Sequence, residues 1–464
     1  MTLKHKRETM KTTLRITMIL FVFVKIVNTM AFGQSYHWDW ARAINCRTTA
    51  IVNSVAADKS GNTYITGGFS DTLTIGGLKL FSKGHSDIFL AKIDTDGNPA
   101  WLRQAGGSES DEAYGIALDN LNNVYITGYV SGDADFSGLA LKTKGARDFF
   151  LAKYDNEGNI LWVKKQEGAN DDYGKSVCAD QQGNVYVSGV FKGPLVLGGQ
   201  TVKPRGKLNV FIYKYSGKGD FCWGRIGEGE GSNQVAEINV DRLCNVYVGG
   251  IFEGKAEFDK NFITSTNTKD VFLVKYNTEG VIQWLKKGGS AIGENNLSAI
   301  AVDSAENIFV TGSFAGIAWF DKKQMKSKGS DDLFLVKYSK EGNVLWAVQS
   351  GGKGNEHAQS MEVDSKGDIL VAGNFTASFT FGPSDISSTG DWDIFILKYS
   401  PDGKMLGGAQ IGGNGYDKAM GIALSGQGNI FLAGYFGDEI KVGNTLLKSP
   451  GKKGCSFIAS LKDL

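Results

Sequence analysis

Polar side chains recur at one spacing along the chain, eight residues before a repeated acid such as Asp119 or Asp180. Carboxylates and amides can bind cations, hydrogen-bond a polar ligand or transfer protons. We predict that these residues form a mostly acidic collar that binds a ligand, and a row of turn-stabilising acids is the alternative. The collar residues are Asp111, Asp172, Asn233, Asn295, Glu356 and Asp417, with Ala50 at the first position. The auxiliary residues are Glu112, Tyr173, His357 and Glu362.

The same residues give little support for a catalytic site. A nucleophile, histidine and acid must be positioned by one another, and His357 alone lies among the candidate loops. Asp171 and Asp172 are adjacent in one loop, so their spacing specifies no acid–base pair. We therefore expect no catalytic residues. A hydrolase or lyase of extracellular polymers that uses the acidic loop residues is the alternative.

Metal and cofactor signals are weak. None of the five cysteines (Cys46, Cys178, Cys222, Cys244 and Cys455) forms a CxxC pair, and the four histidines are scattered, so zinc is unsupported. The run Asp94–Gly97 resembles the start of a calcium loop but lacks the distant bidentate Glu, and turn chemistry explains it better. We expect no cofactor, while Ca²⁺ at the collar and the pairing of the cysteines stay open.

A repeat of about 61 residues organises the chain. The run NVYITG at 123–128 returns in each copy, and the acid before it recurs at steps of 61 or 62 residues, as at Asp58 and Asp119. Each copy contains four runs rich in Val, Ile, Tyr, Phe and Trp, bounded by Gly, Asn and Asp, which is typical of short strands. A Trp recurs in the fourth run, and we expect it to pack between neighbouring repeats. The copies begin near residues 54, 115, 176, 237, 299, 360 and 421.

These repeats predict an all-β, seven-bladed β-propeller with four antiparallel strands per blade. One unpaired strand-like run lies at 38–43 and another at 457–461, so the N-terminal strand is expected to complete the last blade. Residues 34–464 then form a single domain.

The variable connections, between the second and third strands and between successive repeats, share one face, which is the expected binding face. The connections between the second and third strands are basic. They contain Lys79, Lys83, Lys142, Lys144, Lys203, Arg205, Lys322, Lys323, Lys326, Lys328, Lys448, Lys452 and Lys453. An acidic centre inside a basic rim suits a cation or a partner of mixed charge.

The N-terminus reads as a signal peptide over residues 1–33. A basic start precedes an apolar run at 16–27, and Ala31-Phe32-Gly33 is a small-x-small cleavage site before Gln34. A membrane anchor is the alternative, but the run is short and holds Lys25. We expect export to the periplasm, outer surface or medium, with no transmembrane segment after cleavage. The chain has 50 basic and 49 acidic residues, without the basic excess typical of nucleic-acid-binding proteins, so nucleic acid is not an expected partner. We also expect a monomer.

The paired runs Asp119–Val130 with Asp148–Trp162, and Asp303–Phe314 with Asp332–Trp346, resemble the bacterial SBBP (seven-bladed β-propeller) repeat family. The resemblance extends over nearly all of residues 38–464 and implies a propeller in exported or surface proteins, with no catalytic residues to carry over. The expected function is therefore a non-enzymatic scaffold that binds a protein or glycan through the variable-loop face. A purely structural surface module is a further alternative.

Overall fold

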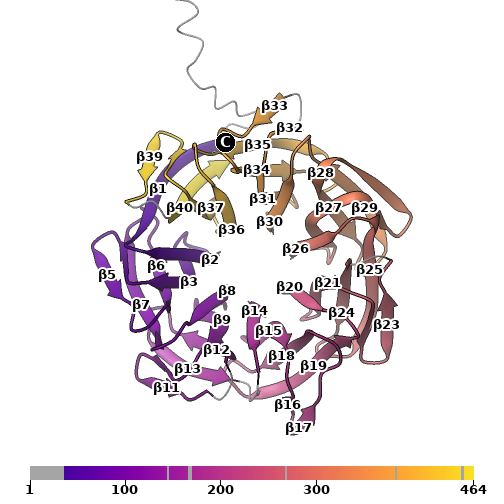
Figure 1. Ribbon diagram of the computed structural model, residues 1–464, viewed down its shortest axis with the longest axis horizontal. Coiled ribbons are helices and arrows are strands. Elements are labelled where there is room, and N and C mark those ends of the chain that lie inside the picture. Colours follow the sequence, from indigo (N-terminus) through magenta and orange to yellow (C-terminus); the bar gives the residue numbers. More distant parts are fainter. Residues whose placement is uncertain are drawn as a thin grey trace, which may run out of the picture. The chain divides into compact units, whose positions relative to one another are not determined.

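The computed structural model describes residues 36–143, 146–165, 170–266, 269–381, 384–450 and 454–463. The predicted signal peptide lies outside this part of the chain, and so do Lys144, Lys452 and Lys453 of the predicted basic rim. Within the unit Phe32–Leu464, the described elements are all β-strands, and their sheets surround a central opening (Figure 1). The predicted propeller is thereby confirmed.

Four kinds of strand recur in chain order from the centre outward (Figure 1). The inner strands are β2 (Thr49–Ala57), β8 (Glu112–Leu118), β14 (Asp172–Ala179), β20 (Gln234–Val240), β26 (Asn295–Val302), β30 (Glu356–Val363) and β36 (Lys418–Leu424). The second strands are β3 (Thr63–Ser70), β9 (Val124–Val130), β15 (Val185–Phe191), β21 (Val246–Phe252), β27 (Ile308–Phe320), β31 (Ile369–Phe375) and β37 (Asn429–Phe436). The third strands are β6 (Asp87–Ile93), β12 (Asp148–Tyr154), β18 (Asn209–Tyr215), β24 (Asp270–Tyr276), β28 (Lys323–Tyr338), β34 (Asp393–Tyr399) and β40 (Cys455–Asp463). The outer strands are β7 (Pro99–Gly107), β13 (Ile160–Lys165), β19 (Phe221–Gly229), β25 (Ile282–Ile292), β29 (Val344–Ser350), β35 (Met405–Ile411) and β1 (Tyr36–Cys46).

The connections between second and third strands fold into hairpins rather than open loops. Most are separate strand pairs, and in one repeat β27 and β28 themselves extend to form the hairpin. The separate pairs are β4 (Thr72–Ile75) with β5 (Leu78–Phe81), β10 (Ala134–Phe136) with β11 (Leu139–Leu141), β16 (Leu195–Leu197) with β17 (Gln200–Val202), β22 (Lys255–Phe258) with β23 (Asn261–Thr264), β32 (Ser378–Phe381) with β33 (Ser384–Ser387), and β38 (Glu439–Val442) with β39 (Thr445–Lys448).

The prediction of seven blades with four strands each is wrong. Hydrogen bonds divide the described strands into six sheets of four or more strands and three separate hairpins, and only two of the six sheets have four strands. The reason is that several hairpins pair with the outer strand of the preceding repeat, as β10 does with β7 and β22 with β19. The long β27 pairs in the same way with β25, which joins two repeats into one eight-stranded sheet.

Burial on both faces explains the continuous apolar runs that mark the second and third strands. Every residue of β9 and β12 is buried, including the charged Asp148 and Lys153. A strand covered on both faces carries apolar residues without alternation, whereas a half-exposed strand alternates. The chain therefore shows apolar runs in the middle of each repeat and mixed sequences in the inner and outer strands.

Recurring tryptophans join neighbouring repeats, as predicted. Each indole N–H donates to a backbone carbonyl in the turn after the next third strand, 55 or 56 residues along the chain, at 2.9–3.3 Å. The donors are Trp40, Trp101, Trp162, Trp223, Trp284 and Trp346. Each ring also lies about 6 Å from an aromatic ring on a second strand, as Trp223 does from Tyr186.

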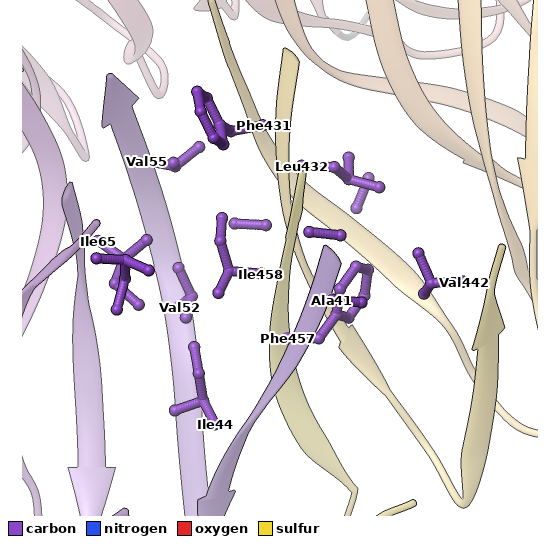
Figure 2. Close-up of a cluster of buried hydrophobic side chains, with 14 of the residues drawn as sticks. Ala41, Ile44, Val52, Val55, Ile65, Phe431, Leu432, Val442, Phe457 and Ile458 are labelled. Atoms are coloured by element: carbon purple, nitrogen blue, oxygen red, sulfur yellow. The ribbon is translucent and has the colours of Figure 1, made fainter. Parts of the chain in front are cut away.

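The first and last described strands close the ring of sheets. β1 pairs with β40 in antiparallel register, with Ala43 opposite Phe457, which confirms the predicted closure. Figure 2 shows side chains of β1, β2, β37 and β40 in one buried cluster, with Ile44 near Val52 and Ile458. The first and last described strands therefore contribute side chains to the core.

Candidate ligand-binding site at the channel mouth

The collar residues are the first residues of the inner strands or lie directly before them. All six are at most 2% exposed. The carboxylate of Asp111 accepts hydrogen bonds from the N–H groups of Gly107 and Ser131 at 2.7 and 2.9 Å. Asp417 accepts in the same way from Gly413 and Gly437 at 2.6 and 3.3 Å. These contacts tie each loop to its neighbour, and a ligand-binding role for the collar stays a prediction.

Burial also changes the ionisation of the collar acids. Loss of solvent raises the pKa of Asp111 and Asp417 to about 6, although backbone N–H groups oppose the shift. The same cause raises the pKa of Asp172 and Glu356 to about 7. The collar acids are thus partly protonated near neutral pH.

A β-bulge in every inner strand decides which side chains reach the central opening. The pairing register shifts by one residue at the same place in each repeat, for example between Ala113 and Gly115. An extra residue reverses the alternation of faces beyond it. The collar positions are buried, and the positions one residue later are more exposed. Those positions hold Ile51, Glu112, Tyr173, Gln234, Asn296, His357 and Lys418, all of them half-buried or exposed.

The bulged residues themselves line a cavity of about 590 Å³ between the inner strands, which we call the central channel. They are Asn53, Tyr114, Lys175, Ala236, Ser298, Gln359 and Met420, and they recur at steps of 61 or 62 residues. None of them was among the residues predicted from the sequence. Their spacing was visible, but a bulge cannot be recognised from alternation alone, because the residues around it read as an ordinary strand.

The two ends of the channel differ in chemistry. At the ends of the inner strands it is lined by small and apolar side chains such as Ala56, Leu118 and Leu424. At their beginnings, which we call the channel mouth, it is lined by amides and hydroxyls. These are Asn53, Ser54, Ser176, Gln234, Asn296, Ser298, Gln359 and Ser360.

A tyrosine cluster adjoins the channel mouth. The ring of Tyr114 lies 5.8 Å from that of Tyr129 and 5.7 Å from that of Tyr173. Glu112 accepts hydrogen bonds from the hydroxyls of Tyr114 and Tyr129 at 3.2 and 3.5 Å. The ammonium group of Lys175 stands 5.2 Å from the Tyr114 ring. The tyrosine cluster therefore presents apolar ring faces next to hydroxyl, carboxylate and ammonium groups.

Two carboxyl groups line the channel below this mouth. Burial raises the pKa of Glu237 to about 8, with a further increase from the nearby charge of Glu362. Burial likewise raises the pKa of Glu362 to about 7. Glu237 also accepts a hydrogen bond from the N–H of Ile300 at 2.5 Å. Because both groups are largely neutral below about pH 6, these two carboxyl groups add little negative charge to the channel there.

His357 belongs to a second aromatic group on the same face. Its ring lies 5.0 Å from that of Trp392, which in turn lies 6.4 Å from the exposed Tyr416. Its Nε2 is 2.9 Å from a carboxylate oxygen of Asp331. In the described part of the chain, no serine, threonine or cysteine side chain hydrogen-bonds this imidazole, so no nucleophile accompanies it there.

Among the described residues of the basic rim, Lys83, Lys142, Arg205 and Lys448 pair with acids of nearby segments. Lys83 pairs with Asp135 at 3.3 Å, and Arg205 pairs with Glu228 and Glu257, each at 3.2 Å. Within the ranges that the structure covers, no group of three or more His, Cys, Asp or Glu side chains is arranged to hold a metal ion. Among the same residues, no helix is long and apolar enough to cross a membrane.

Two curated proteins resemble this chain in sequence. An uncharacterized WD repeat-containing protein of Acanthamoeba polyphaga mimivirus is 23% identical over 75% of this chain. The regulatory protein FlaEY of Caulobacter vibrioides is 26% identical over 29% of it. The chain covers only 32% and 14% of the lengths of these two relatives.

Solved structures resemble it more weakly. Sqt1 from Chaetomium thermophilum matches with a TM-score of 0.44 and 8% identity over 93% of this chain and 100% of its own. The gluconolactonase XC5397 of Xanthomonas campestris matches with a TM-score of 0.34 and 10% identity, over 92% and 99%. At these scores the likenesses carry no inference about ligand or activity. The family model for the SBBP β-propeller repeat matches residues 100–136, and this match supports the resemblance to that family.

Proposed function

We propose that the protein is an exported, monomeric, non-enzymatic scaffold that binds a glycan or protein partner at the channel mouth. The observation that carries this proposal is the ring of amide and hydroxyl side chains at one end of the channel, next to three tyrosines. Asn296 and Gln359 make no side-chain hydrogen bond to other described residues, so their amide groups are free to serve a ligand.

A glycan fits this chemistry better than a protein does. Sugar hydroxyls are hydrogen-bonded by amide groups, and the apolar faces of sugar rings pack on aromatic side chains such as Tyr114. The volume of about 590 Å³ lies within the range of small-molecule sites and suits a few sugar units. The charges at the mouth are mixed, since Lys175 lies near both Glu112 and Lys418, and this favours an uncharged ligand over a strongly charged one.

A glycan array probed with the full chain tests the proposal. We expect a neutral oligosaccharide to bind, and Gln359→Ala or Asn296→Ala to weaken its binding about tenfold, since each loses one or two hydrogen bonds of about 1 kcal/mol. Leu121→Ala is the matched control, because Leu121 is 80% exposed in the turn at the opposite ends of the inner strands. Equal binding by all three variants would contradict this site.

The same experiment separates the alternatives. Release of shortened products would favour the hydrolase or lyase. Retention of a protein, rather than a glycan, whose binding is weakened by Gln359→Ala would keep the scaffold and change its ligand class. Export is tested by the N-terminal residue of the secreted chain, which we expect to be Gln34.

A further inference from the structure

Two cysteines meet where the ring of sheets is closed. Cys46 is the last residue of β1, and Cys455 is the first residue of β40. Their sulfur atoms are 3.9 Å apart, although 409 residues separate them in the chain. Both side chains are buried, and the pairing of Tyr36–Ile44 with Ser456–Asp463 holds the two strands together beside them.

We propose that Cys46 and Cys455 form a disulfide bond that fastens the first described strand to the last. A disulfide requires sulfur atoms about 2.05 Å apart, so the two sulfurs must approach by less than 2 Å. We infer that side-chain rotation provides this approach, since the paired register of the two strands ends directly beside both cysteines. The inference does not depend on the proposed ligand or on its site.

The surroundings favour reaction of this pair. The hydroxyl of Ser449 donates to the sulfur of Cys455 at 3.5 Å, and the thiol of Cys46 lies close enough to do the same. The hydrogen bond from Cys46 lowers the pKa of the Cys455 thiol, and the hydroxyl adds to this effect. Cys455 is therefore the more readily ionised of the two. Because the thiolate is the form that attacks a disulfide, Cys455 is the partner more ready to react.

The oxidant reaches the pair from the side of Cys46. This residue lines an open hollow together with Asn45, Arg47, Thr72, Thr74, Lys79 and Phe81. A small-molecule disulfide such as oxidised glutathione carries carboxylates that suit the charges of Arg47 and Lys79. In the first exchange one cysteine thiolate attacks this disulfide and releases one reduced thiol. The second cysteine thiolate then attacks the mixed disulfide and releases the other. Two protein thiols are thereby oxidised and two small thiols are formed.

The other three cysteines lack such a neighbour. Cys222 is exposed on β19, Cys178 lies on β14 and Cys244 is buried in a turn. Across the described ranges, no sulfur–sulfur contact is found among these three. The structure therefore singles out one pair among the ten that five cysteines permit.

Peptide mapping tests the bond directly. The full chain, purified in reducing buffer, is treated with oxidised glutathione, alkylated and digested with trypsin without reduction. We expect residues 43–47 linked to residues 454–462, with two of the five thiols protected from alkylation. Cys222→Ser should keep the link and Cys46→Ser should abolish it. Alkylation of all five thiols, or a link through another cysteine, would overturn the proposal.

Unfolding of the oxidised and the reduced native chain in urea provides a second measurement, which does not depend on whether the variants fold. We expect the midpoint to rise on oxidation, because the bond closes a loop of nearly the whole chain and restricts the unfolded state. The urea midpoint should return to its value before oxidation when the bond is reduced with dithiothreitol. An unchanged midpoint in a chain that carries the link would show that the bond does not fasten the ring. Loss of glycan binding has no bearing on either result.

Discussion

The collar position accommodates both charged and neutral side chains. The collar holds carboxylates in most repeats but amides at Asn233 and Asn295, and all are buried at the same place. Carboxyl and amide groups have the same shape, so the site selects shape and hydrogen bonding rather than charge. A protonated carboxyl meets this requirement at low pH, and an ionised one is held at a cost in stability.

Asp172→Asn tests this at the residue scale. The pKa of Asp172 is raised from 3.8 to about 7 by burial, so its contribution to stability is fully present below pH 3.8 and is lost progressively as the pH rises to about 7. The variant cannot ionise. We expect its gain in the free energy of unfolding to be about 1–2 kcal/mol larger at about pH 8 than at about pH 5, measured by urea denaturation.

Asp96→Asn is the control for this experiment, because Asp96 is exposed in a turn. It should show no comparable gain between the two pH values. A gain for Asp172→Asn that is equal at both would contradict the ionisation argument.

At the scale of elements, neighbouring repeats are joined through their outer strands. Hairpins add to the outer strand of the preceding repeat, and each recurring tryptophan bonds to a turn of the following one. Trp223 illustrates the second contact, since it is 9% exposed and donates to the carbonyl of Thr278 at 2.9 Å. Adjacent repeats are therefore linked in both directions along the chain.

Trp223→Phe tests the contribution of this link. The variant keeps an aromatic ring but loses the N–H donor and part of the packing against Tyr186 and Tyr276. We expect the free energy of unfolding to fall by about 2 kcal/mol. Leu243→Ala, at a side chain that is 60% exposed, should change it by less than about 0.5 kcal/mol. Similar losses in the two variants would argue against a specific role for the indole.

At the scale of the whole molecule, closure depends on β1. This strand covers one edge of β40 and also pairs with β4, so it connects the last repeat to the first. An uncovered strand edge invites pairing with another chain. Stability should consequently depend strongly on β1.

A chain that begins at Arg47 tests this dependence. It lacks β1, and we expect it to elute as oligomers in size-exclusion chromatography with light scattering and to be cut rapidly by protease. A chain that begins at Gln34 keeps β1 and should remain monomeric. A compact monomer without β1 would show that the sheets close by other contacts.

Much of the fold follows from local patterns. The spacing of about 61 residues, the aromatic and branched residues of the strands and the acids at their turns are properties of short segments, and they predicted the propeller and its closing strand. Asp119 exemplifies the turns, because its carboxylate accepts from the N–H groups of Leu121 and Asn123 at 2.9 Å. The division into sheets was wrong because it depends on pairing between repeats, which no single repeat reveals.

The candidate site shows where sequence reasoning ends. The sequence determined the strands and the face on which the variable connections lie. Only the tertiary structure decided that Asp111 and Asp172 are buried and that the bulged residues Tyr114 and Lys175 line the channel, because a bulge leaves no mark in the pattern of a single strand. The tertiary structure alone also brought Cys46 to Cys455, since contact between residues 409 positions apart is set by closure of the whole ring.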